Sequence, residues 1–327
     1  SVTMMTALAL PTMLRQNYRH ASTTGVIAAS GTLGILIPPS IMLIIMADLM
    51  QVSVGNLFMG ALLPGLGLAA MYLIFIGFWA GLKPEVAPQM GPGELEVGRR
   101  ALPRMLFKAF MPPVILITLI KGSILLGWAT PSEAGAVGAF GATMLAIANG
   151  RLNWPMLKGV CHSSGLTIGM VFMIIVSATC FAYVFRSLGG DYIVEDMIRA
   201  AGLGSWGLLF LLMFMTFFLG FFLDWVEITL IILPIFAPLV IGLDFGDHVS
   251  RAEMLYWFLV LMAVNLQTSF LTPPFGFALF YLKGVAPPEV TTLSVYKGVI
   301  PFVIIQLIGL AVVVWQPEIA LWLPRQI

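Results

Sequence analysis

Long apolar runs, separated by short polar connections, make up most of the chain. A run of about 20 apolar residues is long enough for a helix to cross the hydrocarbon core of a bilayer. A helix also satisfies its own backbone hydrogen bonds in lipid, so the pattern predicts an all-α polytopic membrane protein. The predicted spanning helices are 21–50, 56–82, 105–128, 131–149, 159–185, 254–282 and 298–316.

Two further apolar stretches do not fit a simple crossing. Residues 2–14 are too short to span. Residues 205–243 form a long run that is interrupted by Asp224, Trp225 and Glu227. We expect 205–243 to fold as a re-entrant helical hairpin that enters and leaves the membrane on one face. A single long crossing would place Lys283 and Lys297 outside, against the tendency of cytoplasmic loops to collect basic residues.

An internal repeat links two distant parts of the chain, residues 4–44 and 227–280. Each begins with a short apolar helix that contains a proline, Pro11 or Pro234. Each continues into a span interrupted by small and hydroxyl residues before a double proline, at 28–40 and at 265–276. The first short helix is expected to end inside and the second outside, so the copies are inverted. Inverted repeats with broken helices are typical of secondary transporters.

This pattern predicts one membrane domain over 1–327 with three parts. The first inverted repeat is 1–82, the connecting helices are 83–204, and the second inverted repeat is 205–327. The sequence starts in mid-motif at Ser1, and we expect an N-terminally truncated, partial chain.

Composition supports lipid as the main solvent. The chain is 60% hydrophobic and 9% charged, whereas soluble domains carry about 25% charged residues. The formal net charge of +1 gives no reason to expect a nucleic-acid partner.

The double prolines, Pro38–Pro39 and Pro273–Pro274, predict where ions and substrate bind. Proline removes a backbone donor and disturbs the preceding turn, so each pair should open its helix and free carbonyl groups. In lipid a desolvated cation can satisfy such carbonyls, together with hydroxyl and amide oxygens. The alternative is a simple proline kink patched by water and neighbouring hydroxyls. The candidate residues are Ser30, Gly31, Thr32, Gly34 and Pro38 at the first break, and Asn265, Thr268, Ser269, Thr272 and Pro273 at the second.

Two acidic motifs have both a structural and a functional interpretation. Asp224 at the predicted hairpin tip is either a cation ligand or a helix N-cap, or both, and Glu227 suits the first turn of the following helix. Thr130 and Glu133 are secondary site candidates, but capping of the helix that starts at Pro131 is the favoured interpretation.

Five segments together resemble a known family, the large membrane subunit of tripartite ATP-independent periplasmic (TRAP) transporters. They cover nearly the whole chain and read GTLGILIPPSI, GWATPSEAGAVGA, GFFLDWVEITLIILPIFAP, NLQTSFLTPPFGFALFYLKGVAPPEV and YKGVIPF. The resemblance implies an elevator-type fold and Na+-coupled uptake of a small organic acid, such as a C4-dicarboxylate, across the bacterial inner membrane. It implies no other cofactor. The implied partners are a small four-helix membrane subunit and a periplasmic substrate-binding protein.

The resemblance also carries the ion and substrate sites onto the broken helices and onto Asp224. Two departures stand out: the first arm of the first hairpin is absent, and NLQTSFLTPP has Ser269 and Phe270 where many relatives carry glycine between the Asn and the TPP. Two alternatives remain. One is a stand-alone Na+- or H+-coupled dicarboxylate or citrate symporter. The other, an intramembrane enzyme, would need a catalytic set, and only Asp224 and Glu227 lie at that depth.

Overall fold

The computed structural model describes residues 2–88, 102–190, 192–193, 196, 202–274 and 276–326, and these residues form helices and connecting turns without a strand. By length and apolar composition, five helical stretches in this part of the chain could cross a bilayer. The all-helical membrane architecture is therefore confirmed. The helices at the predicted spans 105–128 and 131–149 are α5 (Leu102–Leu125) and α6 (Pro131–Ala148); neither is among the five, and the apolar part of α5 covers only Phe110–Ile124.

The chain divides into two compact units, which are described separately. One contains residues 1–88 and 176–327, and we call it the repeat unit; the other contains residues 89–175. The second unit holds α5, α6 and the first part of α7 (Trp154–Ser187). Its residues fall inside the segment 83–204 that the sequence suggests as connecting helices. Gly138 and Gly141 of α6 lie directly against Ile120 and Leu116 of α5, the close packing that small residues permit.

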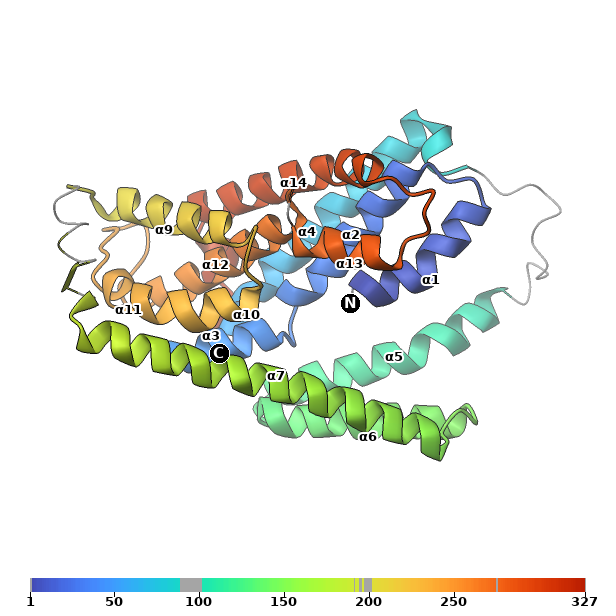
Figure 1. The fold of residues 1–327 in the computed structure, drawn as a ribbon, viewed down its shortest axis with the longest axis horizontal. Helices are drawn as coiled ribbons and strands as arrows, with labels where there is room; N and C mark the ends of the chain where they lie inside the picture. Colours follow the sequence, from blue (N-terminus) through green and yellow to red (C-terminus); the bar gives the residue numbers. More distant parts are fainter. Residues whose placement is uncertain are drawn as a thin grey trace. The chain divides into compact units, whose positions relative to one another are not determined.

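Both predicted helix breaks are present in the repeat unit (Figure 1). The first separates α2 (His20–Leu36) from α3 (Ile41–Leu49), and the second separates α12 (Met254–Leu271) from α13 (Phe277–Val285). Each break contains its double proline, and the Pro38–Pro39 and Pro273–Pro274 peptide bonds are both cis. The spans expected over 21–50 and 254–282 are therefore each two helices, separated at the predicted break.

The elements around the two breaks follow the same order. Before the first break lies α1 (Val2–Arg15), and after it lies α4 (Val54–Leu82). The second copy has α10 (Trp225–Glu227), the π-helical turn η2 (Ile228–Ile232) and α11 (Leu233–Ile241) before its break, and α14 (Thr292–Trp315) after it. Pro64 and Pro301 lie inside the helices that follow the breaks, as the repeat suggests.

The expected hairpin over 205–243 is also present. Helix α9 (Ser205–Leu219) runs into a turn, and η2 with α11 returns beside it (Figure 1). In the same view α2 and α3 run toward the end where α9 starts, whereas α12 and α13 run the other way. The two broken helices are therefore antiparallel, as an inverted repeat requires.

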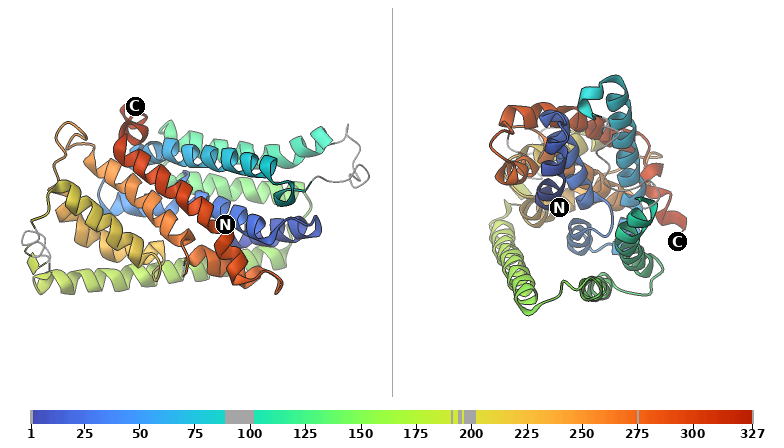
Figure 2. Two further views of the ribbon diagram at one scale, coloured as in Figure 1. Left: turned by 90° about the horizontal axis from the view of Figure 1, so that it is seen from above. Right: turned by 90° about the vertical axis from the view of Figure 1, so that its right-hand side faces the viewer.

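The core of the repeat unit depends on very close helix packing. Helix α14 lies beside α12 in both directions of view (Figures 1 and 2) and makes its most extensive contact with α2. A Cβ atom built on Gly298 of α14 would lie 1.9 Å from the carbonyl oxygen of Ala21, and one on Gly25 of α2 would lie 2.1 Å from the carbonyl oxygen of Gly298. Only glycine allows the two backbones to approach this closely.

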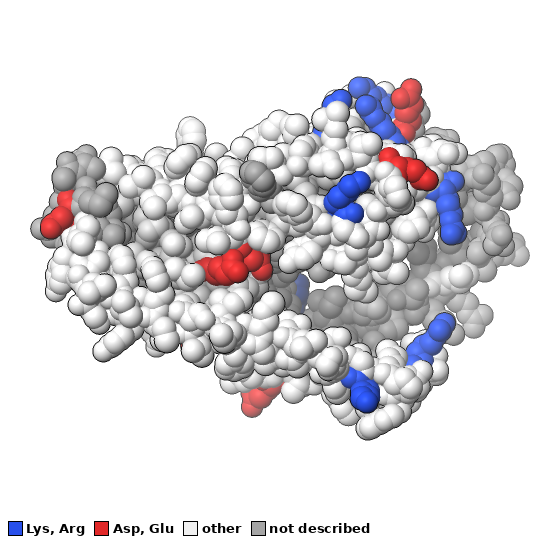
Figure 3. Space-filling view, viewed as in Figure 1, with Lys and Arg blue, Asp and Glu red and all other residues white. Residues whose placement is uncertain are grey.

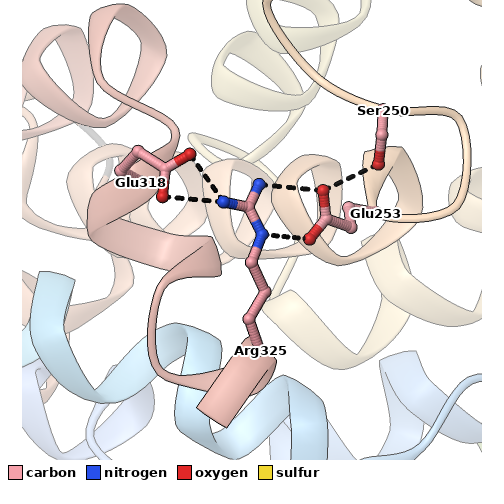
Figure 4. Close-up of polar contacts among 4 residues, drawn as sticks. All are labelled: Ser250, Glu253, Glu318 and Arg325. Atoms are coloured by element: carbon pink, nitrogen blue, oxygen red, sulfur yellow. Dashed lines mark hydrogen bonds and ion pairs between the residues drawn. The ribbon is translucent and has the colours of Figure 1, made fainter.

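An ion-pair cluster fastens the last described segment to the start of α12 (Figure 4). Arg325, in the 3₁₀ turn η3 (Pro324–Gln326), donates to both carboxylate oxygens of Glu253 and, at 2.7 and 2.8 Å, to those of Glu318 in α15 (Glu318–Leu321). Ser250 also donates to Glu253 at 2.7 Å. The guanidinium of Arg325 holds the pKa of Glu253 below its usual range.

Replacing Arg325 with alanine is expected to lower stability at neutral pH by about 1 kcal/mol, because the cluster is partly exposed. Since the pKa of Glu253 is lower in the folded protein, its contribution is present above the unfolded-state pKa of about 4.3 and is lost as pH falls below it. Thermal unfolding of both proteins in detergent between pH 7 and pH 3.5 tests this. The two midpoints should converge at low pH, and the exposed Lys158→Ala serves as the control. A gap that stays constant over this range would contradict the assignment.

Candidate functional site

Asn265 ties the second broken helix to the hairpin. The side chain is buried within α12, and its Nδ2 donates to the carbonyl oxygen of Met213 and to Oγ1 of Thr216, both at 2.8 Å on α9. Because the NH2 group is used in these two bonds, Oδ1 is the atom of Asn265 that can ligate a cation. Thr216 escaped the sequence analysis, although it is the one hydroxyl residue between Trp206 and Leu219 in an otherwise apolar run.

Four of the candidate hydroxyl groups share one arrangement, in which each donates to a backbone carbonyl three or four residues earlier in the chain. The donors and acceptors are Thr32 to Ala29 at 2.9 Å, Thr268 to Val264 at 2.8 Å, Ser269 to Leu266 at 2.8 Å and Thr272 to Thr268 at 2.7 Å. Because the hydroxyl hydrogen is used in this hydrogen bond, only the lone pairs of the hydroxyl oxygen are left for a further partner. Oxygen atoms whose lone pairs are left available in this way suit a hard cation.

The turn of the hairpin 205–243 lies against the second break. A Cβ atom built on Gly220, at the end of α9, would lie 2.1 Å from Oγ of Ser269. Gly276, just after the double proline, lies directly against the end of α12, because a Cβ atom there would lie 2.3 Å from the carbonyl oxygen of Phe270. Neither glycine was among the predicted site residues, and only the GFG that follows the double proline hints at Gly276.

The first break has a matching arrangement with α1. A Cβ atom on Gly31 would lie 2.9 Å from Cα of Val2, so the start of α1 lies against the last turns of α2. Thr32 and Pro38 are buried, Ser30 is half-buried and Gly34 is exposed. Gly31 therefore allows the start of α1 to lie close to the backbone of α2.

Contacts across the repeats bring the two sets of candidates into one region. Helix α12 contacts both α2 and α3, and α13 contacts α2. In addition, the arm of each copy contacts the half-helix of the other copy: α1 packs against α13, and η2 with α11 packs against α3. The candidates at the two breaks therefore lie on neighbouring helices of one compact unit.

Protein groups occupy some of the carbonyls near the breaks. Ser40 donates to the carbonyl oxygen of Ile35 and, as the N-cap of α3, accepts from the backbone N–H of Leu43. Tyr296 of α14 donates to the carbonyl oxygen of Pro274 at 2.7 Å. The proline-kink interpretation therefore holds for these two carbonyls, which are satisfied by hydroxyl groups of the chain. Thr272 and Pro273 at the second break are half-buried.

Asp224 caps a helix, which is one of the two roles, N-cap or cation ligand, that its place in the sequence suggested. It is the N-cap of α10, and its Oδ1 accepts from the backbone N–H of Trp225 at 2.8 Å. Glu227 completes the capping box by accepting from the backbone N–H of Asp224 at 3.0 Å. Both acids are half-buried, and in Figure 3 red atoms surrounded by white, uncharged ones lie near the middle of the view, over the region of α10.

Thr130 and Glu133 cap α6 in the unit of residues 89–175. Thr130 Oγ1 accepts from the backbone N–H of Glu133 at 3.3 Å, and Glu133 Oε2 accepts from the backbone N–H of Thr130 at 2.7 Å. The capping interpretation of this pair is therefore confirmed.

Comparisons with known proteins give one consistent answer. The family described as "Tripartite ATP-independent periplasmic transporter, DctM component" matches residues 1–319. The chain is 30% identical over 325 residues to the C4-dicarboxylate TRAP transporter large permease protein DctM of Pseudomonas aeruginosa, covering 98% of this chain and 71% of that protein.

Relatives with other substrates in their names are also similar. The ectoine TRAP transporter large permease protein TeaC of Halomonas elongata is 28% identical over 96% of this chain and 70% of its own length. The isethionate TRAP transporter permease protein DctMQ of Oleidesulfovibrio alaskensis is 27% identical over 97% of this chain and 47% of its own length.

Proposed function

Because this chain belongs to the family of the DctM component, the large permease of tripartite ATP-independent periplasmic transporters, we propose that it carries out Na+-coupled uptake of a small organic acid. The membrane is the bacterial inner membrane. A periplasmic binding protein delivers the substrate, and a small four-helix membrane subunit is the permanent partner. We propose no cofactor other than the coupling ion.

The observation that carries the proposal is a set of side-chain oxygens at and near the breaks whose lone pairs are available to a cation. Helix α12 and its C-terminal end carry four of these oxygens: Asn265 Oδ1 and the hydroxyl oxygens of Thr268, Ser269 and Thr272. The NH2 group of Asn265 and the hydroxyl hydrogens of the other three already donate hydrogen bonds within the protein. Uncharged oxygen ligands in a dry site suit Na+. Thr32 offers the corresponding oxygen at the first break.

An anionic substrate fits the half-helices that begin after the breaks. Helices α3 and α13 both start at a break, so both direct the positive ends of their dipoles there. Helix α13 has glycine at its N-cap and no side-chain cap, which leaves backbone N–H groups able to meet a carboxylate. Na+ and carboxylate would also attract each other in the low-dielectric interior, which supports coupling of about 1–3 kcal/mol per site.

We further propose an elevator mechanism in which the repeat unit moves as the carrier. Both breaks, the hairpin 205–243 and all the candidate residues except Thr130 and Glu133 belong to this unit. The unit of residues 89–175 would then belong to the scaffold. The names of the relatives contain different substrates, including ectoine and isethionate. We therefore propose organic acids as the substrate class, and the uptake experiment below identifies which acid is transported.

Uptake in proteoliposomes tests this function. The subunit in its full-length form would be reconstituted with its small subunit and binding protein, and a panel of labelled organic acids would be offered with and without an inward Na+ gradient. We expect uptake of one class of acid that needs both Na+ and the binding protein. Uptake that ignores the binding protein would instead support a stand-alone symporter. Uptake that ignores Na+ would contradict the assigned ion coupling.

A further inference from the structure

A hollow lined with basic and hydroxyl residues lies where α1 joins α2, beside the start of α14. It has a volume of about 530 Å³, within the range of small-molecule sites. The connection from α1 to α2 and the start of α14 form its walls, including Asn17, Arg19, His20, Thr291, Ser294 and Lys297. None of these residues belongs to the ion and substrate site proposed above.

The charges around this hollow are unbalanced. Arg19 and Lys297 are cations at neutral pH, and the basic residue His20 lies beside them. None of the described residues that line the hollow is acidic, and within the described chain none of these three basic side chains forms an ion pair with a carboxylate. Figure 3 shows blue atoms gathered at this end of the repeat unit, where α1 joins α2, with some red atoms among them.

Backbone donors add to the same field. Helix α2 begins at His20, and its N-cap Arg19 provides no side-chain cap, so the N–H groups of its first turn have no capping side chain. Helix α14 begins at Thr292 beside the same hollow. The Thr291 side chain caps α14 by accepting from the backbone N–H of Ser294 at 3.2 Å, so the free first-turn donors come from α2, while the dipoles of both helices add to the side-chain charges.

A solvated group of cytoplasmic basic residues is the simple alternative, because such residues gather on that side of most membrane proteins. That alternative requires neither a shared concave surface nor two helix N-termini beside it. The combination found here is typical of sites for a tetrahedral oxyanion, whose oxygens accept from guanidinium, ammonium, hydroxyl and backbone N–H groups together.

We propose that this hollow binds a phosphate group, either the head of an anionic phospholipid or a free phosphate anion. Bound there, the group bridges the α1–α2 connection and the start of α14. These segments are separated by more than 270 residues in sequence, so the bridge is expected to stabilise the repeat unit. The inference does not depend on the transported substrate.

Thermal unfolding of the full-length subunit with its small subunit, in lipid nanodiscs, tests this site without any uptake measurement. One arm compares phosphatidylcholine discs with discs that contain phosphatidylglycerol. The other titrates inorganic phosphate into phosphatidylcholine discs, against chloride at equal ionic strength. The variants are Arg19→Gln/Lys297→Gln, the charge-conserving Arg19→Lys/Lys297→Arg and the control Lys83→Gln. Lys83 is exposed and does not line the hollow, although the turn that follows it contacts α2 through Ser22 and Val86.

We expect the unfolding midpoint of the wild type and of Lys83→Gln to rise with the phosphate-bearing ligand. The concentration needed for half of this rise should increase about tenfold or more in Arg19→Gln/Lys297→Gln, because two charge-assisted contacts are lost. The charge-conserving pair should retain most of the effect, which also shows that the position tolerates substitution. A response to phosphatidylglycerol alone identifies a lipid head, and a response to inorganic phosphate identifies a free anion. No stabilisation by either ligand, or an equal response in the Gln pair, overturns the proposal.

Discussion

Sodium-stimulated uptake is expected to fall at least tenfold when Asn265 is replaced with alanine. The change removes Oδ1 as a cation ligand and also removes the two hydrogen bonds that hold α9 against α12. Lost hydrogen bonds of this kind cost about 1–3 kcal/mol when buried partners remain, which corresponds to roughly ten- to hundredfold in an equilibrium constant. Uptake measured against Na+ concentration should show a much higher half-saturating concentration.

Two comparisons make the Asn265 result specific. Asn149→Ala removes an exposed asparagine from the C-terminal end of α6, where Nδ2 bonds only to the carbonyl oxygen of Leu145, so Na+ dependence should not change. Thr272→Ala should raise the half-saturating Na+ concentration less than Asn265→Ala, because Thr272 is only half-buried and its hydroxyl donates to Thr268 of the adjoining helix turn. An Asn265→Ala protein that folds and retains wild-type Na+ activation would remove Asn265 from the ion site.

The second large effect concerns stability rather than transport. Gly298→Ala is expected to destabilise the protein by about 3 kcal/mol, because its new methyl group would overlap the backbone of Ala21 and force α14 away from α2. The overlap is with backbone atoms, so a side-chain rotation cannot relieve it. The unfolding midpoint in detergent, compared at one heating rate because unfolding of such proteins is often irreversible, should drop by several degrees.

Gly77→Ala is the matched control for this substitution. Gly77 also lies inside a long helix, α4, but a Cβ atom there would meet nothing within 4 Å. Alanine is favoured over glycine in a helix interior by about 0.5–1 kcal/mol, so this variant should be unchanged or slightly more stable. If the two variants behave alike, the close approach of α2 and α14 is not what stabilises this interface.

Features governed by local chemistry were predictable from the sequence. Proline stops a helix through its own ring and its missing N–H, so Pro38 and Pro273 located both breaks. Asp224 and Thr130 each precede a helix with glutamate three residues later, the signal of a capping box, and both boxes are present. The hairpin over 205–243 was predictable from the basic residues, because one long crossing would have placed Lys283 and Lys297 outside the cell.

Contacts between distant segments were not predictable in the same way. Nothing near Asn265 in sequence indicates that its partner is Thr216, because the pairing depends on how the hairpin docks against α12. The Gly25–Gly298 contact likewise depends on the register of two helices that are far apart in the chain. Tyr296, which satisfies the carbonyl of Pro274, lies beyond the motif that drew attention to the break. The ligating roles of the candidate residues at both breaks stay predictions for the uptake experiments.

The exchange of contacts between the two repeats has a consequence for how access to the site is controlled. Helix α1 packs against α13, and the arm formed by η2 and α11 packs against α3, so each arm is supported by the half-helix of the opposite copy. If the proposed cation draws the second break together, α13 moves, and so does the surface against which α1 packs. In the elevator mechanism proposed above, the two arms would therefore be coupled, because a change at one break alters the surface against which the arm of the other copy packs.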